Sequence, residues 1–241
     1  MGKTYALITG ASGEIGQAIA RELALQGHHL YLHYYQNKQA VEQLQFELSS
    51  DVECRLIKAN LASPEGPGQL VEQLEQAIDV LVYNCGSSHS GLMTDVSDKE
   101  LDSMVQLQLK SPFQLLQRIL PSMITKKQGS IVMITSIWGQ TGASCEVLYS
   151  MVKGGMNTMV KALSKEMAPS GIRVNAVAPG IIATKMNEHL TDEELEAISE
   201  DIPLGRFGLP EEVADAVGYL ISPKSSYITG HILPVNGAWY C

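Results

Sequence analysis

The stretch that decides the fold is YALITGASGEIG, residues 5–16. An apolar run is followed at once by Gly10, Gly13 and Gly16, and then by a helical pattern. Glycine lets the backbone turn tightly and approach a ligand closely, and a helix start offers free N–H groups and the positive end of the helix dipole. A tight turn alone needs glycine, but the position after the first strand favours a dinucleotide-binding loop.

Outward from this loop, strand-like and helical segments alternate to the end of the chain. Several of the strand-like runs are continuously apolar, which is typical of strands buried on both faces. Without internal repeats or linkers, the alternation predicts an α/β fold: a doubly wound parallel seven-stranded sheet (Rossmann fold) in a single domain, residues 1–241. The seven predicted strands are residues 5–9, 30–34, 53–58, 80–83, 130–135, 173–178 and 232–235. Ligands of such sheets bind at the carboxyl ends of the strands.

Capping patterns predict where several helices begin. The first helix should span residues 16–26, with Ile19, Leu23 and Gln26 on one stripe. Ser63, followed by proline, predicts an N-cap with proline in the first helical position. Two Ser/Thr-x-x-Glu patterns, at residues 97–100 and 191–194, predict capping boxes.

Composition excludes several classes of protein. The 241 residues carry a net charge of -9, which argues against a nucleic-acid or anionic-membrane surface. No apolar run approaches the roughly 20 residues of a membrane span, and the first residues do not have the pattern of a signal peptide. The four scattered cysteines predict free thiols in a reducing compartment and no metal site. We therefore expect a cytoplasmic protein.

Three residues form a candidate catalytic set. Ser136 follows the fifth predicted strand, and Tyr149 and Lys153 lie four residues apart, on one face of a helix. We expect the Lys153 cation to lower the pKa of Tyr149, which would then protonate a carbonyl oxygen while Ser136 holds it. A bare Y-x-x-x-K is common by chance, but its combination with the serine and the glycine loop is not.

Together these motifs resemble the single-domain branch of the short-chain dehydrogenase/reductase family. Residues 79–86 (DVLVYNCG) are similar to the family's D-x-L-V-N-N-A-G, and residues 175–180 (NAVAPG) match its N-x-V-x-P-G. Residues 202–214 (IPLGRFGLPEEVA) are most similar to 3-oxoacyl-[acyl-carrier-protein] reductases, although other members share this motif.

The resemblance implies a nicotinamide dinucleotide as cofactor and a set of residues around it. Pro179 to Thr184 would line the nicotinamide. The implied catalytic residues are Ser136, Tyr149, Lys153 and Gln108, which takes the place of a family asparagine. The implied cofactor-binding residues are Gly10, Ser12, Gly13, Glu14, Ile15, Gly16, Tyr34, Asn60, Leu61, Asn84, Cys85, Gly86, Tyr149, Lys153, Pro179, Gly180, Ile182 and Thr184.

Several positions depart from the family pattern. Glu14 stands where the family has its middle glycine, and we expect its carboxylate to point outward, away from a bound phosphate. Asn60 replaces an aspartate near the adenine, and Tyr83 and Cys85 replace asparagine and alanine. Gln108 keeps the amide of the family's asparagine but adds a methylene, which puts the proton relay through the lysine in doubt.

The cofactor is expected to be NADPH (NADP) rather than NADH. Residues 33–38 (HYYQNK), after the second strand, contain no acid that would favour NAD. The arginine that many NADP-dependent members carry in the glycine loop is also absent, since Gly13 stands there. Lys38 or His33 is then the candidate for binding the 2′-phosphate, and the alternative is that both are ordinary surface residues.

The resemblance implies reduction of 3-oxoacyl-[acyl-carrier-protein] in fatty acid synthesis. Acyl-CoA, sugar or quinone-like carbonyls remain alternatives, and so does a dinucleotide-binding sensor without turnover. An acidic carrier protein would need a basic patch, and Lys126 and Lys127 are the candidates, or simply a solvated helix end.

Two further expectations concern assembly and motion. The apolar close, residues 231–241, resembles the family's interface segment and predicts a homotetramer. Residues 184–204 predict a substrate lid. This stretch is rich in acids and has only a sparse apolar stripe at Leu190, Leu195 and Ile198, so a helix there should dock weakly. An ordinary surface helix is the alternative.

Overall fold

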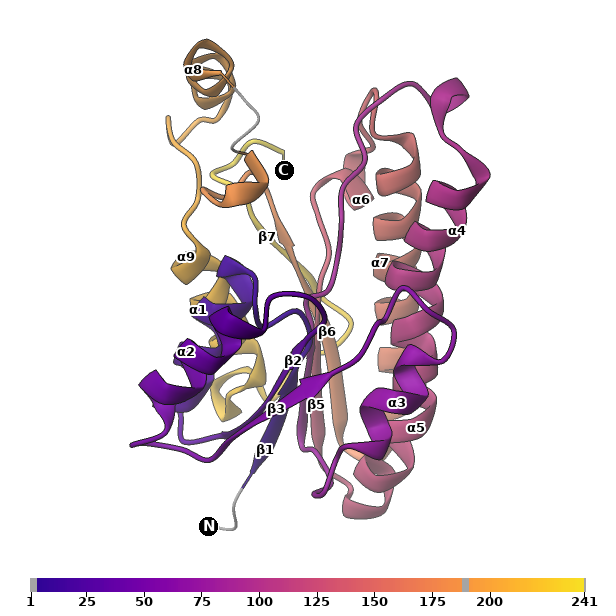
Figure 1. Ribbon diagram of the computed structural model, residues 1–241, viewed down its shortest axis with the longest axis vertical. Coiled ribbons are helices and arrows are strands. Elements are labelled where there is room, and N and C mark those ends of the chain that lie inside the picture. Colours follow the sequence, from indigo (N-terminus) through magenta and orange to yellow (C-terminus); the bar gives the residue numbers. More distant parts are fainter. Residues whose placement is uncertain (1–3, 188–190, 241) are drawn as a thin grey trace.

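The computed structural model describes residues 4–187 and 191–240, and its centre is one seven-stranded sheet (Figure 1). All pairings are parallel, in the order β3-β2-β1-β4-β5-β6-β7. The strands are β1 (Tyr5–Ile8), β2 (His29–Tyr34), β3 (Cys54–Lys58), β4 (Val80–Tyr83), β5 (Gly129–Ile134), β6 (Ile172–Pro179) and β7 (Ile232–Val235). The predicted seven-stranded Rossmann sheet is thus confirmed, and the strand order reverses between β1 and β4.

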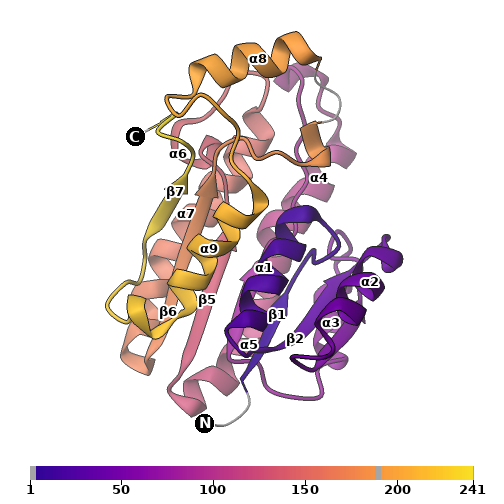
Figure 2. The ribbon, with the colours of Figure 1, turned by 90° about the vertical axis from the view of Figure 1, so that its left-hand side faces the viewer.

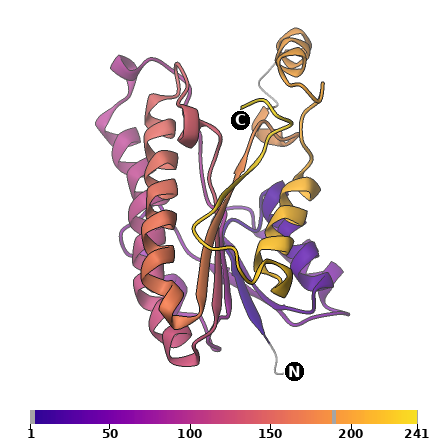
Figure 3. The same cartoon turned by 180° about the vertical axis from the view of Figure 1, so that it is seen from behind.

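Helices cover both faces of the sheet (Figures 1 and 3). One layer holds α1 (Glu14–Leu25), α2 (Lys38–Leu48) and α9 (Pro210–Ile221). The other holds α3 (Gly66–Glu72), α4 (Asp98–Val105), α5 (Ser111–Lys126) and α7 (Val147–Met167). The short α6 (Trp138–Thr141) and α8 (Asp192–Asp201) lie at the carboxyl end of the sheet, where α8 runs across the end of the molecule (Figure 2). The remaining turns are η1 (Met93–Asp95), the π-helix η2 (Gln106–Lys110), η3 (Ala168–Ser170), η4 (Lys185–Asn187) and η5 (Pro223–Ser225).

The two layers explain why strands such as β1 are apolar throughout. In β1, Ala6 and Ile8 belong to the core cluster under α1, α2 and α9, and Leu7 belongs to the cluster under α3, α5 and α7. All three are fully buried. Because successive side chains of a strand point to opposite faces, a strand covered on both sides must be apolar at every position.

The helix starts agree with the sequence in two cases and differ in one. Both capping boxes form, at Ser97 with Glu100 and at Thr191 with Glu194. The start predicted at Ser63 is wrong, because Ser63 lies in a turn and α3 begins at Gly66. A Cβ on Gly66 would stand only 1.9 Å from the Asn60 carbonyl oxygen, so the chain first closes a tight turn against residue 60. Ile19 and Leu23 of α1 are buried as expected, but Gln26 lies just after the end of α1 and is exposed.

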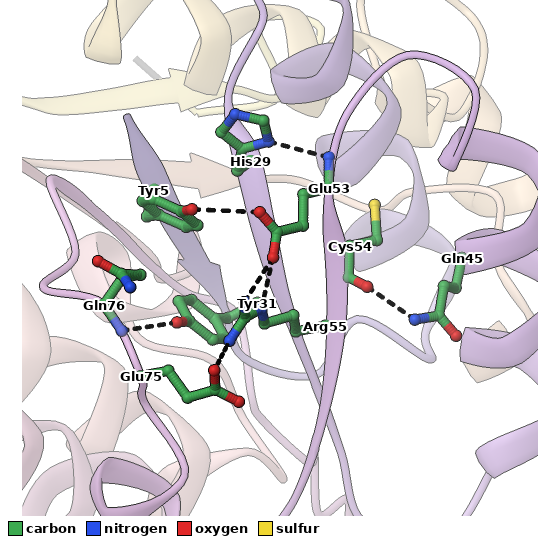
Figure 4. Close-up of polar contacts among 9 residues, drawn as sticks. All are labelled: Tyr5, His29, Tyr31, Gln45, Glu53, Cys54, Arg55, Glu75 and Gln76. Carbon is green, nitrogen blue, oxygen red and sulfur yellow. Dashed lines mark hydrogen bonds and ion pairs between the residues drawn. The ribbon is translucent and has the colours of Figure 1, made fainter. Parts of the chain in front are cut away.

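A polar network ties β1, β2 and β3 together near their amino ends (Figure 4). Tyr5 Oη donates to Glu53 Oε2 at 3.2 Å, and Glu53 N donates to His29 Nδ1 at 2.9 Å. Arg55 pairs with Glu53 at 2.6 Å and with Glu75. This network lies at the opposite end of the strands from the residues expected to bind ligand, and it fixes the edge of the sheet.

Within the described part of the chain, no helix has the length and apolar character that crossing a bilayer would require.

Candidate functional site

The glycine loop has the shape of a phosphate cradle. Gly10 has a φ of +66°, in the left-handed region that favours glycine, and a Cβ on Gly16 would stand 2.3 Å from the Gly10 carbonyl oxygen. Helix α1 then begins at Glu14, and its N-cap residue Gly13 makes no side-chain capping bond. The first N–H groups of α1 therefore remain available to an anion.

Neighbouring strands hold this loop in place. The amide of Gly10 donates to His33 Nδ1 at 3.1 Å, and Asn84 Nδ2 donates to the Gly10 carbonyl at 3.1 Å. The hydroxyl of Thr9 accepts from the amides of Asn84 at 2.9 Å and Cys85 at 3.2 Å. The sequence analysis assigned no role to Thr9, and it did not predict that His33 holds the glycine loop. The threonine before the first glycine was the only sequence signal, because the contacts cross strands.

His33 cannot bind the 2′-phosphate, so this expectation is corrected. Its Nδ1 accepts from Gly10, which leaves Nε2 to donate to the Ala59 carbonyl at 3.1 Å. The side chain is buried, and burial lowers its pKa to about 4. A neutral imidazole with both nitrogens engaged has no charge or donor to offer a ligand.

Glu14 does not point out into solvent, as we expected, but bridges to another loop. Its Oε2 accepts a hydrogen bond of 2.7 Å from the backbone amide of Lys185, and the residue is half-buried. The carboxylate thereby joins the first turn of α1 to the segment after β6. Thr184 is the neighbouring residue on that segment, and its hydroxyl donates to the Ile182 carbonyl at 3.3 Å.

The catalytic candidates Ser136, Tyr149 and Lys153 lie together at the carboxyl end of β5. Ser136 is hydrogen-bonded to Tyr149, and Lys153 Nζ lies 5.4 Å from the centre of the Tyr149 ring. Lys153 Nζ also donates to the Ile134 carbonyl at 3.0 Å. A Cβ on Gly139 would stand 2.6 Å from the Lys153 carbonyl carbon, so α6 and α7 pack backbone to backbone here. This close packing fixes the positions of all three residues.

The pKa of Tyr149 shifts in the direction opposite to our expectation. Burial raises it to about 12, and the hydrogen bond with Ser136 only partly offsets this. Burial also lowers the pKa of Lys153 to about 7. The Lys153 ammonium lies over the Tyr149 ring, and burial is the largest cause of the shift in the Tyr149 pKa. Tyr149 is thus a protonated phenol at neutral pH, which is the form that an acid needs.

Gln108 is completely buried in the π-helix η2. Its Nε2 donates to the Ser87 carbonyl at 2.8 Å, whereas its Oε1 has no hydrogen-bond partner among the described residues. A Cβ on Gly86 would stand 3.3 Å from both this Oε1 and Lys153 Nζ. The amide therefore presents an unused acceptor close to the lysine.

Two departures from the family pattern meet at this π-helix. The Tyr83 hydroxyl donates to the Leu107 carbonyl, directly before Gln108. A π-turn shifts the backbone hydrogen bonds of a helix and leaves carbonyls in need of donors. Tyr83 is completely buried and supplies such a donor from β4. The sequence marked Tyr83 and Gln108 as separate anomalies, and only the fold shows that they support the same turn.

The segment after β6 reaches the same centre. Ile137 N donates to the Pro179 carbonyl at 3.1 Å, directly beside Ser136, and Gly180 N donates to the Val235 carbonyl at 2.9 Å. Ile182 forms an isolated bridge with Gly208. The expected nicotinamide-lining residues therefore lie next to the Ser136 loop and close to Glu14.

The residues expected around the adenosine lie farther along the same edge. Tyr34 ends β2 and is buried, and Asn60 and Leu61 follow β3. Asn60 Oδ1 accepts from Ala62 N at 3.1 Å, which stabilises the turn after β3. Ser12 and Ile15 lie in the glycine loop and the first turn of α1, partly exposed.

The candidate basic residues differ in position. Lys38 lies at the start of α2 and pairs with Glu42 at 2.6 Å. Lys126 and Lys127 lie at the carboxyl end of α5, before β5 begins, and Lys126 pairs with Asp79 at 2.8 Å. They are therefore at the opposite end of the sheet from Ser136, so within one chain they do not border the catalytic residues (Figure 1).

These residues fit a nicotinamide dinucleotide. The glycine cradle and the uncapped α1 start suit a pyrophosphate, and the Glu14 carboxylate is directed at Lys185 N. Gly86 leaves open space beside Lys153 and Gln108, where a side chain would crowd both. An acid, a hydroxyl and an ammonium then converge where a carbonyl can be held.

The chain is similar over its whole length to known proteins. A family model described as Enoyl-(Acyl carrier protein) reductase matches residues 10–239. An uncharacterized oxidoreductase, YmfI, of Bacillus subtilis (strain 168) is 51% identical, with 100% of both chains covered. The 3-oxoacyl-[acyl-carrier-protein] reductase FabG of Rickettsia bellii is 40% identical over 96% of this chain and 95% of its own. FabG of Staphylococcus epidermidis is 35% identical over 98% of both.

Proposed function

Because this chain belongs to the short-chain dehydrogenase/reductase family, we propose that it uses NADPH to reduce 3-oxoacyl-[acyl-carrier-protein] to the 3-hydroxyacyl form. It is an NAD(P)-dependent oxidoreductase acting on CH–OH groups. The proposal of this particular substrate rests on two features taken together. The chain has the Ser136–Tyr149–Lys153 set, and it is similar over nearly its full length to two proteins named for this reaction.

The dinucleotide, when bound, supplies the hydride that adds to the carbonyl carbon. Ser136 then holds the carbonyl oxygen with its hydroxyl, and the Tyr149 phenol gives that oxygen its proton. Burial keeps Tyr149 protonated at neutral pH, which suits the direction of reduction. The lowered pKa of Lys153 lets this residue exchange a proton near neutral pH and return one to Tyr149. The unused Gln108 Oε1 offers an acceptor beside Lys153 for that exchange, in place of the family's asparagine.

The proposed preference for NADPH rests on the end of β2. Residues 33–38 include no carboxylate to hold a ribose hydroxyl or repel a 2′-phosphate. Lys38 is exposed at the start of α2, and its ion pair with Glu42 is an exposed one that a phosphate can displace at little cost. His33 contributes only by fixing the glycine loop.

A panel of carbonyl substrates with both nicotinamides tests the proposal. We expect 3-oxoacyl thioesters on acyl carrier protein to be reduced with a higher kcat/KM than 3-oxoacyl-CoA, sugars or quinones, and with NADPH in preference to NADH. A higher kcat/KM for another class of carbonyl would mean that this class, and not 3-oxoacyl-[acyl-carrier-protein], is the substrate. Tight nucleotide binding without turnover on any carbonyl would instead make the chain a sensor. Fluorescence titration gives the Kd of each nucleotide, and equal or tighter NADH binding would overturn the preference for NADPH.

A further inference from the structure

We propose that Trp138, Trp239 and Tyr240 form an aromatic wall of the substrate site that recognises an apolar group attached to the reacting carbonyl. This inference rests on the proposed function, because it assigns the acyl portion of that substrate to a surface. The three side chains are defined here as the aromatic wall. They come from α6 and from the last residues of the chain, which are brought together at the carboxyl end of the sheet (Figure 1).

The wall is tied directly to the catalytic serine. Trp138 N donates to Ser136 Oγ at 3.2 Å, so the indole begins two residues from the hydroxyl that holds the carbonyl. The backbone packing of Gly139 on Lys153 fixes α6 against α7. Trp138 is therefore held next to Ser136 in the chain, and we place the substituents of a ligand bound by Ser136 and Tyr149 against its indole.

The three rings pack against one another. Trp138 lies 5.3 Å from Trp239 and 5.4 Å from Tyr240 between ring centres, with interplanar angles of 62° and 66°. Such edge-to-face pairs stabilise an aromatic cluster beyond simple burial. Trp138 and Trp239 nevertheless stay partly exposed, and Tyr240 is 40% exposed. The cluster thus presents ring surface that no other described residue covers.

The turn at residues 236–238, which brings the chain back to Trp138, has an unusual backbone conformation. Gly237 and Ala238 both have positive φ, +60° and +66°. Asn236 closes the turn, since its Oδ1 accepts from Ala238 N at 3.1 Å and its Nδ2 donates to the Tyr240 carbonyl at 2.7 Å. A non-glycine residue in this conformation is costly and persists only where the surroundings enforce it. This turn holds Trp239 and Tyr240 against Trp138 of α6.

The same turn also contacts the segment that we place at the nicotinamide and the end of the proposed lid. A Cβ on Gly180, which we place at the nicotinamide, would stand 3.0 Å from Asn236 Cα. Leu204 N, at the end of the proposed lid, donates to the Gly237 carbonyl at 3.3 Å. The terminal turn therefore lies between cofactor, lid and aromatic wall. This placement suits a surface that senses the substrate rather than a loose end.

The aromatic chemistry favours an acyl chain over a sugar. Ring faces and edges stabilise alkyl groups by desolvation, and they offer few of the hydrogen-bonding groups that a polyol requires. In this wall only the Tyr240 hydroxyl and two indole N–H groups are polar. An exposed apolar surface of this kind marks a contact. The sequence predicts that residues 231–241 lie at a subunit interface, whereas the hydrogen bond from Trp138 N to Ser136 Oγ leads us to assign the contact of the aromatic wall to the substrate.

Kinetics on matched substrates test the wall. The measurement is kcat/KM with NADPH for the N-acetylcysteamine thioesters of 3-oxooctanoate and 3-oxobutanoate, in the full-length chain and in Trp138→Ala, Trp239→Ala and Trp138→Phe. We expect both alanine variants to lower the ratio of the longer to the shorter substrate by about tenfold or more, since one methylene in an apolar site is worth about that much. Trp138→Phe should retain most of the ratio, and Phe46→Ala, an exposed aromatic of α2, should not change it. The proposal is overturned if the alanine variants leave this ratio unchanged, lower kcat/KM equally for both substrates, or raise kcat/KM for the longer substrate.

Binding without turnover separates this inference from the proposed function. The chain has two tryptophans, and both lie in the wall, so intrinsic tryptophan fluorescence reports on it alone. Octanoyl-N-acetylcysteamine, which has no 3-oxo group, should change the emission, and the butanoyl compound should change it far less. If the enzyme reduces no 3-oxoacyl thioester but the emission still depends on the length of the acyl chain, the proposed function fails while the aromatic wall is supported. Emission that follows protein concentration but not ligand would assign the wall to an interface and overturn the inference.

Discussion

Glu14 Oε2 accepts a hydrogen bond of 2.7 Å from the backbone amide of Lys185, a residue 171 positions away in the chain. The first turn of α1 and the segment after β6 are thereby joined at the edge of the proposed cofactor site. A carboxylate at a helix start interacts favourably with the helix dipole, but it repels an incoming phosphate. Glu14 therefore both orders the site and opposes the anion that the site should bind.

Replacing Glu14 by glutamine separates these two effects. Glutamine keeps an oxygen that can accept from Lys185 N, and it removes the charge. We expect Glu14→Gln to tighten NADPH binding by about three- to tenfold at low salt, because a nearby half-exposed charge is worth about 1 kcal/mol. The gain should shrink at high salt. Glu211→Gln, in the first turn of α9, is the matched control. Unchanged or weaker binding at low salt would mean that the carboxylate does not act on the phosphates.

Tyr149→Phe should remove the proton donor and leave the ring in place. We expect kcat to fall by about 10²- to 10⁴-fold, which is the usual contribution of a general acid, with NADPH binding largely retained. Tyr227→Phe, at a fully exposed tyrosine, serves as the control. Near wild-type reduction by Tyr149→Phe across the pH range would contradict the assigned mechanism.

Lys153 should make the stability of the protein depend on pH. Its pKa is lowered by burial to about 7 from an ordinary 10.5, so between these values the unfolded chain binds a proton that the folded chain does not. Stability must then rise with pH from about 7, by up to roughly 1.4 kcal/mol per pH unit, and fall as the pH drops through 7. Urea denaturation between pH 7 and 8 should show this rise, because most cysteines of the unfolded chain, with an ordinary pKa of about 8.5, are still thiols there. Lys153→Met should lack it, whereas Lys165→Met, on the exposed face of α7, should retain it. Equal slopes in wild type and Lys153→Met would refute the lowered pKa.

The proposed lid, residues 184–204, should open in the free enzyme. Of its apolar stripe, Leu195 and Ile198 are only half-buried in α8, and Leu190 lies outside the described residues. Ile202 is buried against Gly237, which anchors the carboxyl end. We expect residues 186–202 to exchange amide hydrogens quickly when free and slowly with NADPH and a substrate analogue bound. Protection in the free enzyme equal to that of β5 would make the segment a fixed wall.

The chain should assemble as a homotetramer. Exposed apolar side chains lie on two separate surfaces: Leu101, Phe113 and Met151 on α4, α5 and α7, and Tyr219 and Tyr227 on and after α9. Two different self-complementary surfaces produce a tetramer with dihedral symmetry. Light scattering at micromolar concentration should give the mass of four 26.2 kDa chains, and Phe113→Glu should reduce it to that of two. A monomeric wild type would contradict this assembly.

The sequence by itself determined the sheet and the chemistry of its main residues. Strand-like runs alternating with helical ones identified all seven strands, and every predicted strand end lies within one residue of the observed end. The signal was clearest for strands that are buried on both faces and therefore apolar throughout, such as β1 and β4. The glycine loop and the four-residue spacing of Tyr149 and Lys153 were readable because both are local patterns set by backbone geometry.

What only the tertiary structure decided were relationships across the chain. The sequence predicted a Tyr149 pKa lowered by Lys153, whereas the fold buries the phenol and places the cation over its ring, so that desolvation raises the pKa instead. His33 resembled a phosphate ligand until the fold placed it beneath Gly10. The bond from Lys185 to Glu14 joins residues that no local pattern relates. Charge, burial and hydrogen bonding depend on which groups the topology brings within a few ångströms, and a linear pattern does not contain those distances.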